Sequence, residues 1–209
     1  MIKTLRSNRD CRAALGRVIH DLHQRRWCEG TGGNFSVVFN RNPLQLLMAP
    51  SGVDKGLVEP EQLLLVDASG TVIDGDGRSS AETDLHLCIV NQTGAGAVLH
   101  THSPIATVLS KQYEAHGGIE ISGWEMLKGL EGINTHEASI NIPVISNSQS
   151  MQVLVDAITP KLKSSPHGFL VAGHGLYAWG DNLEQAKRHT EILEYLLEIN
   201  ALSTHLTSK

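Results

Sequence analysis

The sequence predicts a single α/β domain built on a largely antiparallel sheet. Segments with helical periodicity alternate with short β-prone runs along the chain, which is typical of a mixed α/β domain. Several neighbouring β-prone runs are joined by short polar turns, and strands joined in this way pair antiparallel. The chain of 209 residues has the size of one domain and contains no internal repeat or linker. We therefore expect one domain over residues 1–209.

The N-terminal third is expected to form a helix followed by two hairpins. Residues 8–27 carry apolar side chains at helical spacing, which predicts an amphipathic helix. The glycine-rich segment "EGTGGN" ends this helix. The β-prone runs on both sides of "NRNP" predict a hairpin over residues 35–50, and those around "ASG" predict another over residues 63–75.

The middle of the chain is expected to form a helix, a strand and a second helix. Residues 81–92 predict a helix whose N-cap is Ser79 or Ser80, because a serine hydroxyl accepts a hydrogen bond from the first backbone N–H groups. The apolar run at residues 96–102 predicts a strand. Residues 103–112 predict a helix, since a proline stands near its first turn.

The C-terminal part continues the alternation of strands and helices. Residues 113–137 predict no definite element. A strand is expected at residues 138–145 and a helix at residues 148–162. Residues 168–180 predict two short strands or one bent strand, and residues 182–202 predict a long amphipathic helix.

Charge and cysteine content narrow the classes of function. The formal net charge is −5, which is not the basic footprint of a nucleic-acid-binding protein. The sequence shows no apolar run long enough to span a bilayer and no secretory signal. Cys11, Cys28 and Cys88 are odd in number and far apart, which is typical of thiols in a reducing compartment. We therefore expect a cytoplasmic protein without a nucleic-acid or membrane partner.

The segment "AVLHTHSP", residues 97–104, places two histidines at the end of a predicted strand. Successive side chains on a strand point to opposite faces, so His100 and His102 project to the same side. His174, between two glycines at the end of another apolar run, is the candidate for a third metal ligand. Three imidazoles leave a fourth coordination position open, as in catalytic zinc sites. A solvated polar strand end would show the same histidine pair, so the pattern alone leaves both interpretations open.

Three segments are suited to binding an anion. "GTGGNFS" (residues 30–36) and "APSGVDKG" (residues 49–56) contain glycines that expose backbone N–H groups in tight turns. "RSSAE" (residues 78–82) places two serines at a predicted helix N-terminus. Each segment alone is most simply a turn, but three of them in one domain favour a phosphate ligand.

Two glutamates are candidates for proton transfer. Glu82 follows "SSA", and Glu125 stands in "GWEMLKG". A surface glutamate is usually only solvated. Trp124 and Met126 are expected to desolvate Glu125 partly, which would raise its pKa toward the range that acid–base catalysis requires.

Taken in order, "GTGGNFS", "APSGVDKG", "SSAET", "HTHSP" and "AGHG" resemble the class II aldolase/adducin family. The resemblance extends over residues 8–200. It implies a three-layer α/β/α fold with a central, mainly antiparallel sheet and helices on both faces. It also implies a cyclic homotetramer.

The resemblance further implies one Zn²⁺ per subunit, held by His100, His102 and His174. Many aldolases of the family carry two consecutive serines before the glutamate, whereas this chain has Ala81 at the second position. One phosphate contact is therefore expected to be missing, and Lys55 is the candidate to replace it. The implied phosphate-binding residues are Gly33, Asn34, Ser51, Gly52 and Ser80.

Within the family, "SGVDKG", "WEMLKG" and "GHGLYAWG" are most similar to a branch that dehydrates a sugar phosphate. This similarity implies a zinc-dependent hydro-lyase that converts 5-methylthioribulose 1-phosphate to 5-methylthio-2,3-diketopentyl 1-phosphate and water, in methionine salvage. The acid/base residue of this branch matches Glu125, whereas that of the sugar-phosphate aldolases matches Glu82. Because both are present, the division of their roles is open, and Glu125 is our choice.

Two other functions are compatible with the sequence. A zinc-dependent class II aldolase or epimerase acting on a pentulose phosphate would use the same metal, and only the branch-specific similarity separates it from a dehydratase. A noncatalytic module, as in adducin heads, would share the fold. The three candidate ligands and the phosphate loops are all present, which argues against the noncatalytic module.

Overall fold

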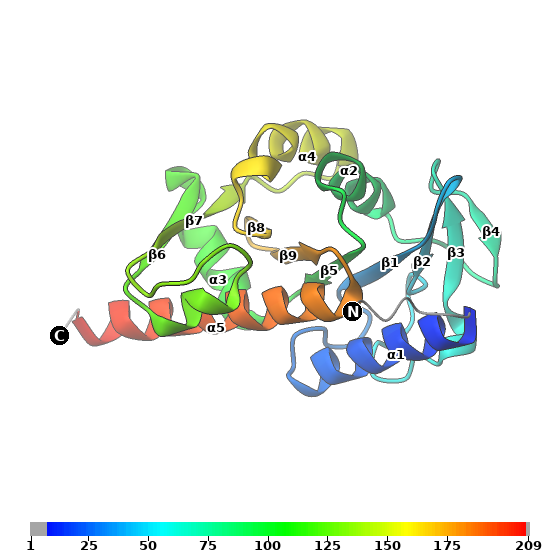
Figure 1. Ribbon diagram of the computed structural model, residues 1–209, viewed down its shortest axis with the longest axis horizontal. Helices are drawn as coiled ribbons and strands as arrows, with labels where there is room; N and C mark the ends of the chain where they lie inside the picture. The colour runs from blue at the N-terminus through cyan, green and yellow to red at the C-terminus, as the bar shows by residue number, and fades with distance from the viewer. Residues whose placement is uncertain (1–7, 208–209) are drawn as a thin grey trace.

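The computed structural model describes residues 8–207, and within this range a nine-stranded sheet forms the centre of the molecule (Figure 1). The strand order is β4-β3-β2-β1-β5-β9-β8-β7-β6. Neighbouring strands pair antiparallel except β7 and β8, so the predicted mainly antiparallel sheet is confirmed. The strands are β1 (Asn34–Arg41), β2 (Leu44–Met48), β3 (Leu64–Asp67), β4 (Val72–Asp74), β5 (Ala97–Thr101), β6 (Gly118–Ser122), β7 (Ser139–Ile145), β8 (Gly168–Val171) and β9 (Gly175–Gly180).

Helices cover both faces of the sheet, which confirms the three-layer α/β/α fold (Figure 1). Helices α2 and α4 pack on one face, where they bury Val98 of β5. Helices α1, α3 and α5 lie on the other face, where Leu99 of β5 packs toward α1 and Leu176 of β9 packs toward α3 and α5. The helices are α1 (Asn8–Gln24), α2 (Thr83–Thr93), α3 (Pro104–Gln112), α4 (Met151–Ile158) and α5 (Leu183–Thr207).

Strand β5 lies near the middle of the sheet, between β1 and β9, and all five of its residues are buried. The alternation of side chains sends Val98 and Leu99 into different helix layers, so both faces of the strand must be apolar. Burying one such side chain contributes about 1.5–3 kcal/mol to stability. A central, fully packed strand is therefore a rigid support for the histidines at its C-terminal end.

The two predicted hairpins are confirmed as β1–β2 and β3–β4. The predicted cap of the next helix is wrong, because α2 begins at Thr83 and its N-cap is Glu82. Ser80 instead belongs to the turn before the helix, where its hydroxyl accepts a hydrogen bond from the backbone N–H of Glu82 at 3.2 Å. Thr83 donates its own hydroxyl to the carbonyl oxygen of Ser80 at 2.6 Å.

The region for which no element was predicted contains β6 and the 3₁₀-helix η3 (Glu125–Gly129). In β6, Ile119 and Ile121 are buried while the residues between and after them are exposed. Five residues are too few for this alternation to stand out in the sequence. The predicted element at residues 168–180 proves to be two strands, β8 and β9, joined by a tight turn.

The backbone next to β9 leaves no room for a side chain at Gly96, which precedes β5. Gly96 donates its N–H to the carbonyl oxygen of Gly180 at 2.8 Å, and a Cβ atom at Gly96 would lie 2.0 Å from the carbonyl oxygen of Asp181. We expect Gly96→Ala to lower the free energy of unfolding by about 3 kcal/mol, because backbone must move to relieve the contact. Chemical denaturation measures this change in the free energy of unfolding.

The control is Gly94→Ala. A Cβ at Gly94 meets open space, so only its left-handed φ of 78° disfavours alanine, and we expect the free energy of unfolding to fall by about 1 kcal/mol. Equal losses in the two variants would contradict the prediction.

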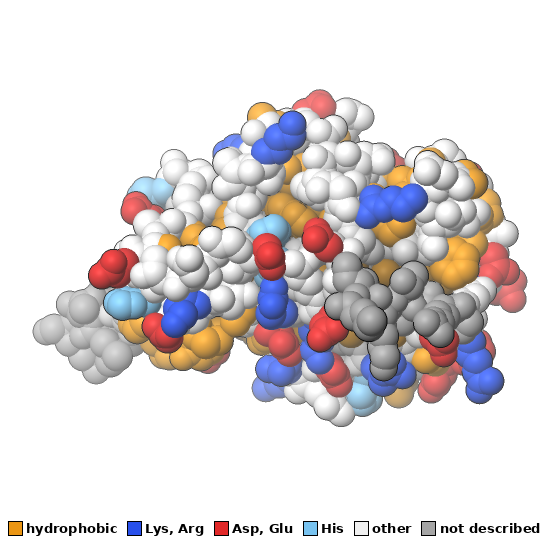
Figure 2. Space-filling view, in the orientation of Figure 1, with side chains coloured by type: hydrophobic (Ala, Val, Ile, Leu, Met, Phe, Trp, Pro, Cys, Tyr) orange, Lys and Arg blue, Asp and Glu red, His pale blue; other side chains and the backbone are white. Residues whose placement is uncertain are grey.

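The surface shown in Figure 2 carries acidic and basic side chains interspersed with one another. Ion pairs such as Lys187–Asp21 (2.6 Å) and Arg188–Glu131 (3.1 Å) connect segments that are far apart in the sequence. Within residues 8–207, every helix is too short or too polar to cross a membrane.

Candidate metal centre

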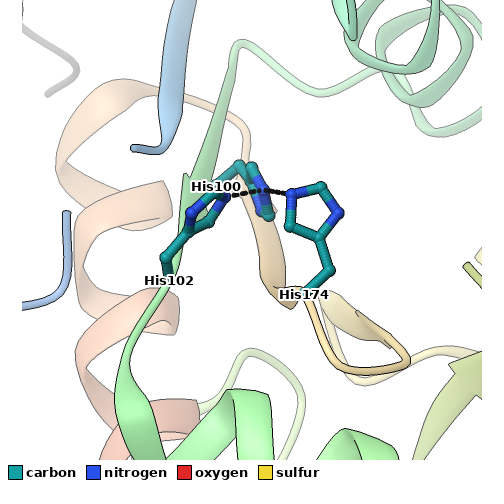
Figure 3. Close-up of side chains that lie close together, drawn as sticks. All are labelled: His100, His102 and His174. Atoms are coloured by element: carbon teal, nitrogen blue, oxygen red, sulfur yellow. Dashed lines mark hydrogen bonds between the residues drawn. The ribbon is translucent and has the colours of Figure 1, made fainter. Parts of the chain in front are cut away.

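Three histidines from two distant segments meet at the ends of the central strands β5 and β9 (Figure 3). His100 is in β5 and His102 follows the last residue of that strand, so both project to the same side, as predicted. His174 lies in the turn between β8 and β9. Since β9 pairs with β5, this turn lies beside the end of β5. Gly175 allows the close approach, because a Cβ there would lie 2.0 Å from the carbonyl oxygen of Thr101.

The facing ring nitrogens are close enough to share one ion. The Nε2 atom of His100 lies 2.8 Å from Nε2 of His102 and 3.3 Å from Nε2 of His174. All three candidate ligand atoms lie within 4.8 Å of one another. The sequence predicted this grouping from the spacing of two histidines and a glycine-flanked third, and the structure brings all three together.

The hydrogen bonds of His100 define which of its nitrogens is available. Its Nδ1–H donates to the carbonyl oxygen of Leu176 at 2.9 Å, which leaves the lone pair of Nε2 directed at the other two rings. Tyr177 stacks on the His100 ring, with centroids 3.9 Å apart and planes 11° from parallel, and holds the ring in place. This support from β9 was not predicted, because nothing in the sequence pairs Tyr177 with His100.

Burial keeps His100 and His102 in the neutral form that binds metal. Burial, together with the charges that His102 and His174 would carry, lowers the pKa of His100 well below its ordinary value. Burial lowers the pKa of His102 to about 4, with smaller contributions from His174 and Lys55. The Nδ1 atom of His174 is buried and has no hydrogen-bond partner among the described residues. Three imidazole Nε2 atoms that converge at such distances fit a divalent cation such as zinc, because one cation can accept all three lone pairs.

Glu82 completes one side of this centre. Its carboxylate oxygens lie 3.6 Å from Nε2 of His100 and 3.4 Å from Nε2 of His174. The side chain is 14% exposed, so the carboxylate faces the histidines rather than bulk water. The predicted candidate Glu82 is therefore within reach of any ligand bound at the triad.

A chain of hydrogen bonds orients the Glu82 carboxylate. The Nδ2 amide group of Asn34 donates to Glu82, and the Oδ1 atom of Asn34 accepts from Nε2–H of His86. The Nδ1 atom of His86 in turn accepts from the hydroxyl of Ser36 at 2.7 Å. Burial lowers the pKa of His86 to about 3, which keeps it neutral and preserves this donor pattern. The sequence gives no signal for this role of His86, because several other histidines also lie on helices.

Of the residues predicted to bind phosphate, Asn34 is the first residue of β1 and the other four lie in loops. A Cβ at Gly33 would lie 2.8 Å from the carbonyl oxygen of His100, so this glycine loop abuts the histidines. The N–H of Ser51 donates to the carbonyl oxygen of Arg78 at 2.9 Å, which joins the loop of Ser51 and Gly52 to the loop that carries Ser80. Asn34 has its amide committed to Glu82. The phosphate contacts themselves stay a prediction.

Lys55 is buried, with only 2% of its surface exposed. Its Nζ donates to the carbonyl oxygens of Thr31 and Val53, at 3.1 and 3.0 Å, so it joins the two glycine-containing loops. Burial lowers the pKa of Lys55. In this structure Lys55 holds loops together, and its replacement of a missing phosphate contact stays a prediction.

Glu125 does not have the environment that the sequence suggested. Its side chain is 70% exposed and pairs with Lys128 at 2.5 Å, and more loosely with His136 at 3.8 Å. The hydrogen bond and charge of Lys128 lower the pKa of Glu125, so the predicted desolvation and raised pKa are wrong for the single chain. Trp124 and Met126 are themselves more than one-third exposed and cover little of it. Within residues 8–207 no ion pair or hydrogen bond joins Glu125 to the triad.

A three-layer α/β fold that brings three histidines together beside a carboxylate has the arrangement of a catalytic metal site. Residues 13–201 match the family described as Class II Aldolase and Adducin N-terminal domain. The chain belongs to this family, as the sequence motifs indicated.

Relatives and solved structures agree with this assignment. The chain is 41% identical over 181 residues to a "Methylthioribulose-1-phosphate dehydratase" of Xanthomonas campestris pv. campestris, covering 86% of this chain and 82% of that protein. It is 40% identical over 188 residues to the protein of the same name from Pectobacterium atrosepticum, covering 88% and 90%. An "L-fuculose 1-phosphate aldolase" superposes with a TM-score of 0.77 at 25% identity, over 94% of this chain and 87% of that one.

Proposed function

We propose that the chain is a metal-dependent dehydratase that converts 5-methylthioribulose 1-phosphate to 5-methylthio-2,3-diketopentyl 1-phosphate and water. The observation that carries the proposal is the convergence of His100, His102 and His174 beside the Glu82 carboxylate. The relatives named above support this choice of reaction, because they match at about 40% identity over most of both chains. The proposed role is a step of methionine salvage.

We assign one Zn²⁺ per subunit to the three Nε2 atoms. When bound, a divalent cation supplies Lewis-acid stabilisation of the negative charge that develops on the ketose oxygens. Leu176 and Tyr177 hold His100 ready for this role through a hydrogen bond and ring stacking. Imidazole ligands alone do not select zinc over iron, cobalt or manganese, so the identity of the metal requires elemental analysis.

Carboxylates of the chain have to move two protons. A base removes the proton from C3, and an acid protonates the hydroxyl at C4, which leaves as water. The product is an enol, which loses its hydroxyl proton and gains a proton at C4 to become the 2,3-diketone. We assign the proton transfer to Glu125, with Glu82 as the carboxylate fixed at the centre by Asn34. Positioned general acids and bases contribute about 10²- to 10⁴-fold to such steps.

The phosphate group of the substrate is proposed to bind Gly33, Asn34, Ser51, Gly52 and Ser80. Asn34 pairs with His100 at the start of β1, Gly33 precedes it, and the loop of Ser51 and Gly52 is bonded to the loop that carries Ser80. Binding a group remote from the reacting carbons positions those carbons and lowers the barrier of the chemical step.

We further propose a cytoplasmic homotetramer. The cysteines Cys11, Cys28 and Cys88 are all unbridged, as suits a reducing compartment. Burial raises the pKa of Cys11 to about 11 and that of Cys28 to about 12, so both thiols are unreactive at neutral pH. The oligomeric state is tested by light scattering of the purified protein.

A zinc-dependent aldolase or epimerase is the second candidate. The position of Glu82 favours it, because the resemblance assigns the acid/base role of the sugar-phosphate aldolases to this residue, and it lies beside the triad. An aldolase would break the C3–C4 bond of a pentulose phosphate instead of expelling the C4 hydroxyl.

Product identification separates the two candidates. Zinc-loaded protein is incubated with 5-methylthioribulose 1-phosphate, and the products are analysed by mass spectrometry. We expect a single product that is lighter than the substrate by one water. A three-carbon phosphate fragment would establish the aldolase instead, and no turnover by zinc-loaded protein would contradict the proposed substrate.

A further inference from the structure

A buried carboxylate lies behind the histidine pair, on the side away from the centre. Glu194 belongs to α5, and only 3% of its surface is exposed. One carboxylate oxygen accepts a hydrogen bond from the hydroxyl of Thr101 at 2.5 Å, and the other accepts from the hydroxyl of Ser103 at 2.5 Å. These two donors are the residues immediately before and after His102. Glu194 therefore forms a hydrogen bond with each neighbour of His102, one of the three candidate metal ligands.

Burying the Glu194 carboxylate costs folding free energy, because the charged form loses its hydration. None of the ion pairs between described residues involves Glu194, so no lysine, arginine or histidine side chain among them pairs with its carboxylate. Burial raises the pKa of Glu194 to about 7, although the hydrogen bonds from Ser103 and Thr101 act in the opposite direction. Apolar residues at such a position usually give equal or greater stability. Retaining a carboxylate there points to a role in positioning its partners.

The segment that carries His102 needs such a support. Strand β5 ends at Thr101, so the sheet ladder does not fix the chain beyond that residue. The N–H of His102 donates to the carbonyl oxygen of Trp27 at 2.6 Å. Ser103 caps α3 by accepting from the N–H of Ala106 at 3.1 Å and at the same time donates to Glu194. Glu194 is thus the group that joins the strand end to the helix start across His102.

We propose that Glu194 is a positioning residue for the metal centre. By accepting hydrogen bonds from Thr101 and Ser103, it holds the backbone of His102 so that the imidazole faces His100 and His174. The inference rests on the proposed function, because it assumes that the three histidines bind a metal ion. Outer groups that orient ligands typically contribute 10- to 100-fold to metal affinity.

The test compares Glu194→Gln with Glu198→Gln. The glutamine at 194 keeps the volume but cannot accept from two hydroxyls through two oxygens. Glu198 is exposed, one turn further along α5, so its variant removes a nearby negative charge and no hydrogen bond to the histidine segment. Zinc affinity is measured by competition with a chromophoric chelator, and the visible spectrum of the cobalt-substituted protein reports the ligand geometry. We expect Glu194→Gln to bind zinc 10- to 100-fold more weakly, with an altered cobalt spectrum, and Glu198→Gln to match the wild type.

Thr101→Val provides a second variant in case Glu194→Gln does not fold. It is nearly isosteric and removes only one of the two donors, so we expect weaker zinc binding in the same direction. The double variant should be less affected than the sum of the two single variants, because both remove the same hydrogen bond.

The outcomes separate this inference from the proposed function. In one outcome, the wild-type protein binds zinc and dehydrates the substrate, while Glu194→Gln and Thr101→Val both match Glu198→Gln in zinc affinity and cobalt spectrum. The positioning role of Glu194 is then wrong, and the proposed function stands. If the wild type binds no zinc, both are overturned.

Discussion

Replacing His102 with alanine is expected to abolish zinc binding and to reduce turnover of 5-methylthioribulose 1-phosphate about a thousandfold, the equivalent of about 4 kcal/mol of transition-state stabilisation. His102 supplies one of the three converging Nε2 atoms, 2.8 Å from that of His100. Two imidazoles cannot hold the ion firmly, and the negative charge that develops on the substrate then loses its stabilisation. Zinc content is measured by elemental analysis after dialysis, and turnover by the appearance of product.

The matched control is His20→Ala, which removes an exposed histidine of α1. It is expected to retain zinc and full activity. His102 is preferred over His100 for this experiment because His100 is completely buried between Leu176 and Tyr177, so its removal would also disturb the core. A His102→Ala protein that keeps stoichiometric zinc, or full turnover without it, would contradict the assignment of the centre.

Glu125→Gln is expected to lower kcat about 10²- to 10⁴-fold and to leave zinc affinity unchanged. The loss removes the proposed proton-transfer group, whereas the three histidines are untouched. The activity of Glu125→Gln is compared with that of Glu82→Gln. The carboxylate of Glu82 lies 3.4 Å from Nε2 of His174. If Glu82→Gln loses activity and Glu125→Gln does not, the acid/base role belongs to Glu82.

The exposed position of Glu125 leads to a prediction about how subunits of the proposed tetramer share a site. Within the described chain Glu125 pairs with Lys128 and does not reach the triad of its own subunit. We therefore expect it to act at the centre of a neighbouring subunit. His102→Ala and Glu125→Gln are each expected to be nearly inactive alone. Mixed tetramers of the two would contain sites that combine an intact triad with an intact glutamate.

Subunits mixed at equal amounts should recover about one-quarter of wild-type activity, because each half of a shared site is intact in half of the subunits. Co-expression with two different affinity tags, followed by purification through both, yields the mixed tetramers. If Glu125 acts within its own subunit, every site lacks one group and activity stays at the level of the separate variants.

The local pattern of the sequence was sufficient for most elements and for part of the centre. The two-residue period of a strand placed His100 and His102 on one side, and the glycines around His174 indicated a close backbone approach. The hairpins and the main helices followed from apolar periodicity and turn residues. These features depend on residues a few positions apart, which is why a single sequence reveals them.

The cap of α2 and the environment of Glu125 were not predictable in the same way. Ser80 has the chemistry of an N-cap, but the turn before the helix uses its hydroxyl and carbonyl group for Glu82 and Thr83. Trp124 and Met126 flank Glu125 in sequence, yet they leave it exposed, because neighbours in a chain need not share a buried environment.

The sequence by itself determined the kind of protein: a mixed α/β domain with a histidine pair at a strand end, glycine loops beside it and a third histidine to complete a metal site. The tertiary structure alone decided how these parts support one another. The contacts of Glu82 with Asn34, of Tyr177 with His100 and of Glu194 with Thr101 join residues between 48 and 93 positions apart. The contact of Tyr177 arises from the pairing of β9 with β5, and that of Glu194 from the packing of α5 against these strands. The contact of Glu82 joins the start of α2 to the start of β1. No local pattern of residues encodes these pairings.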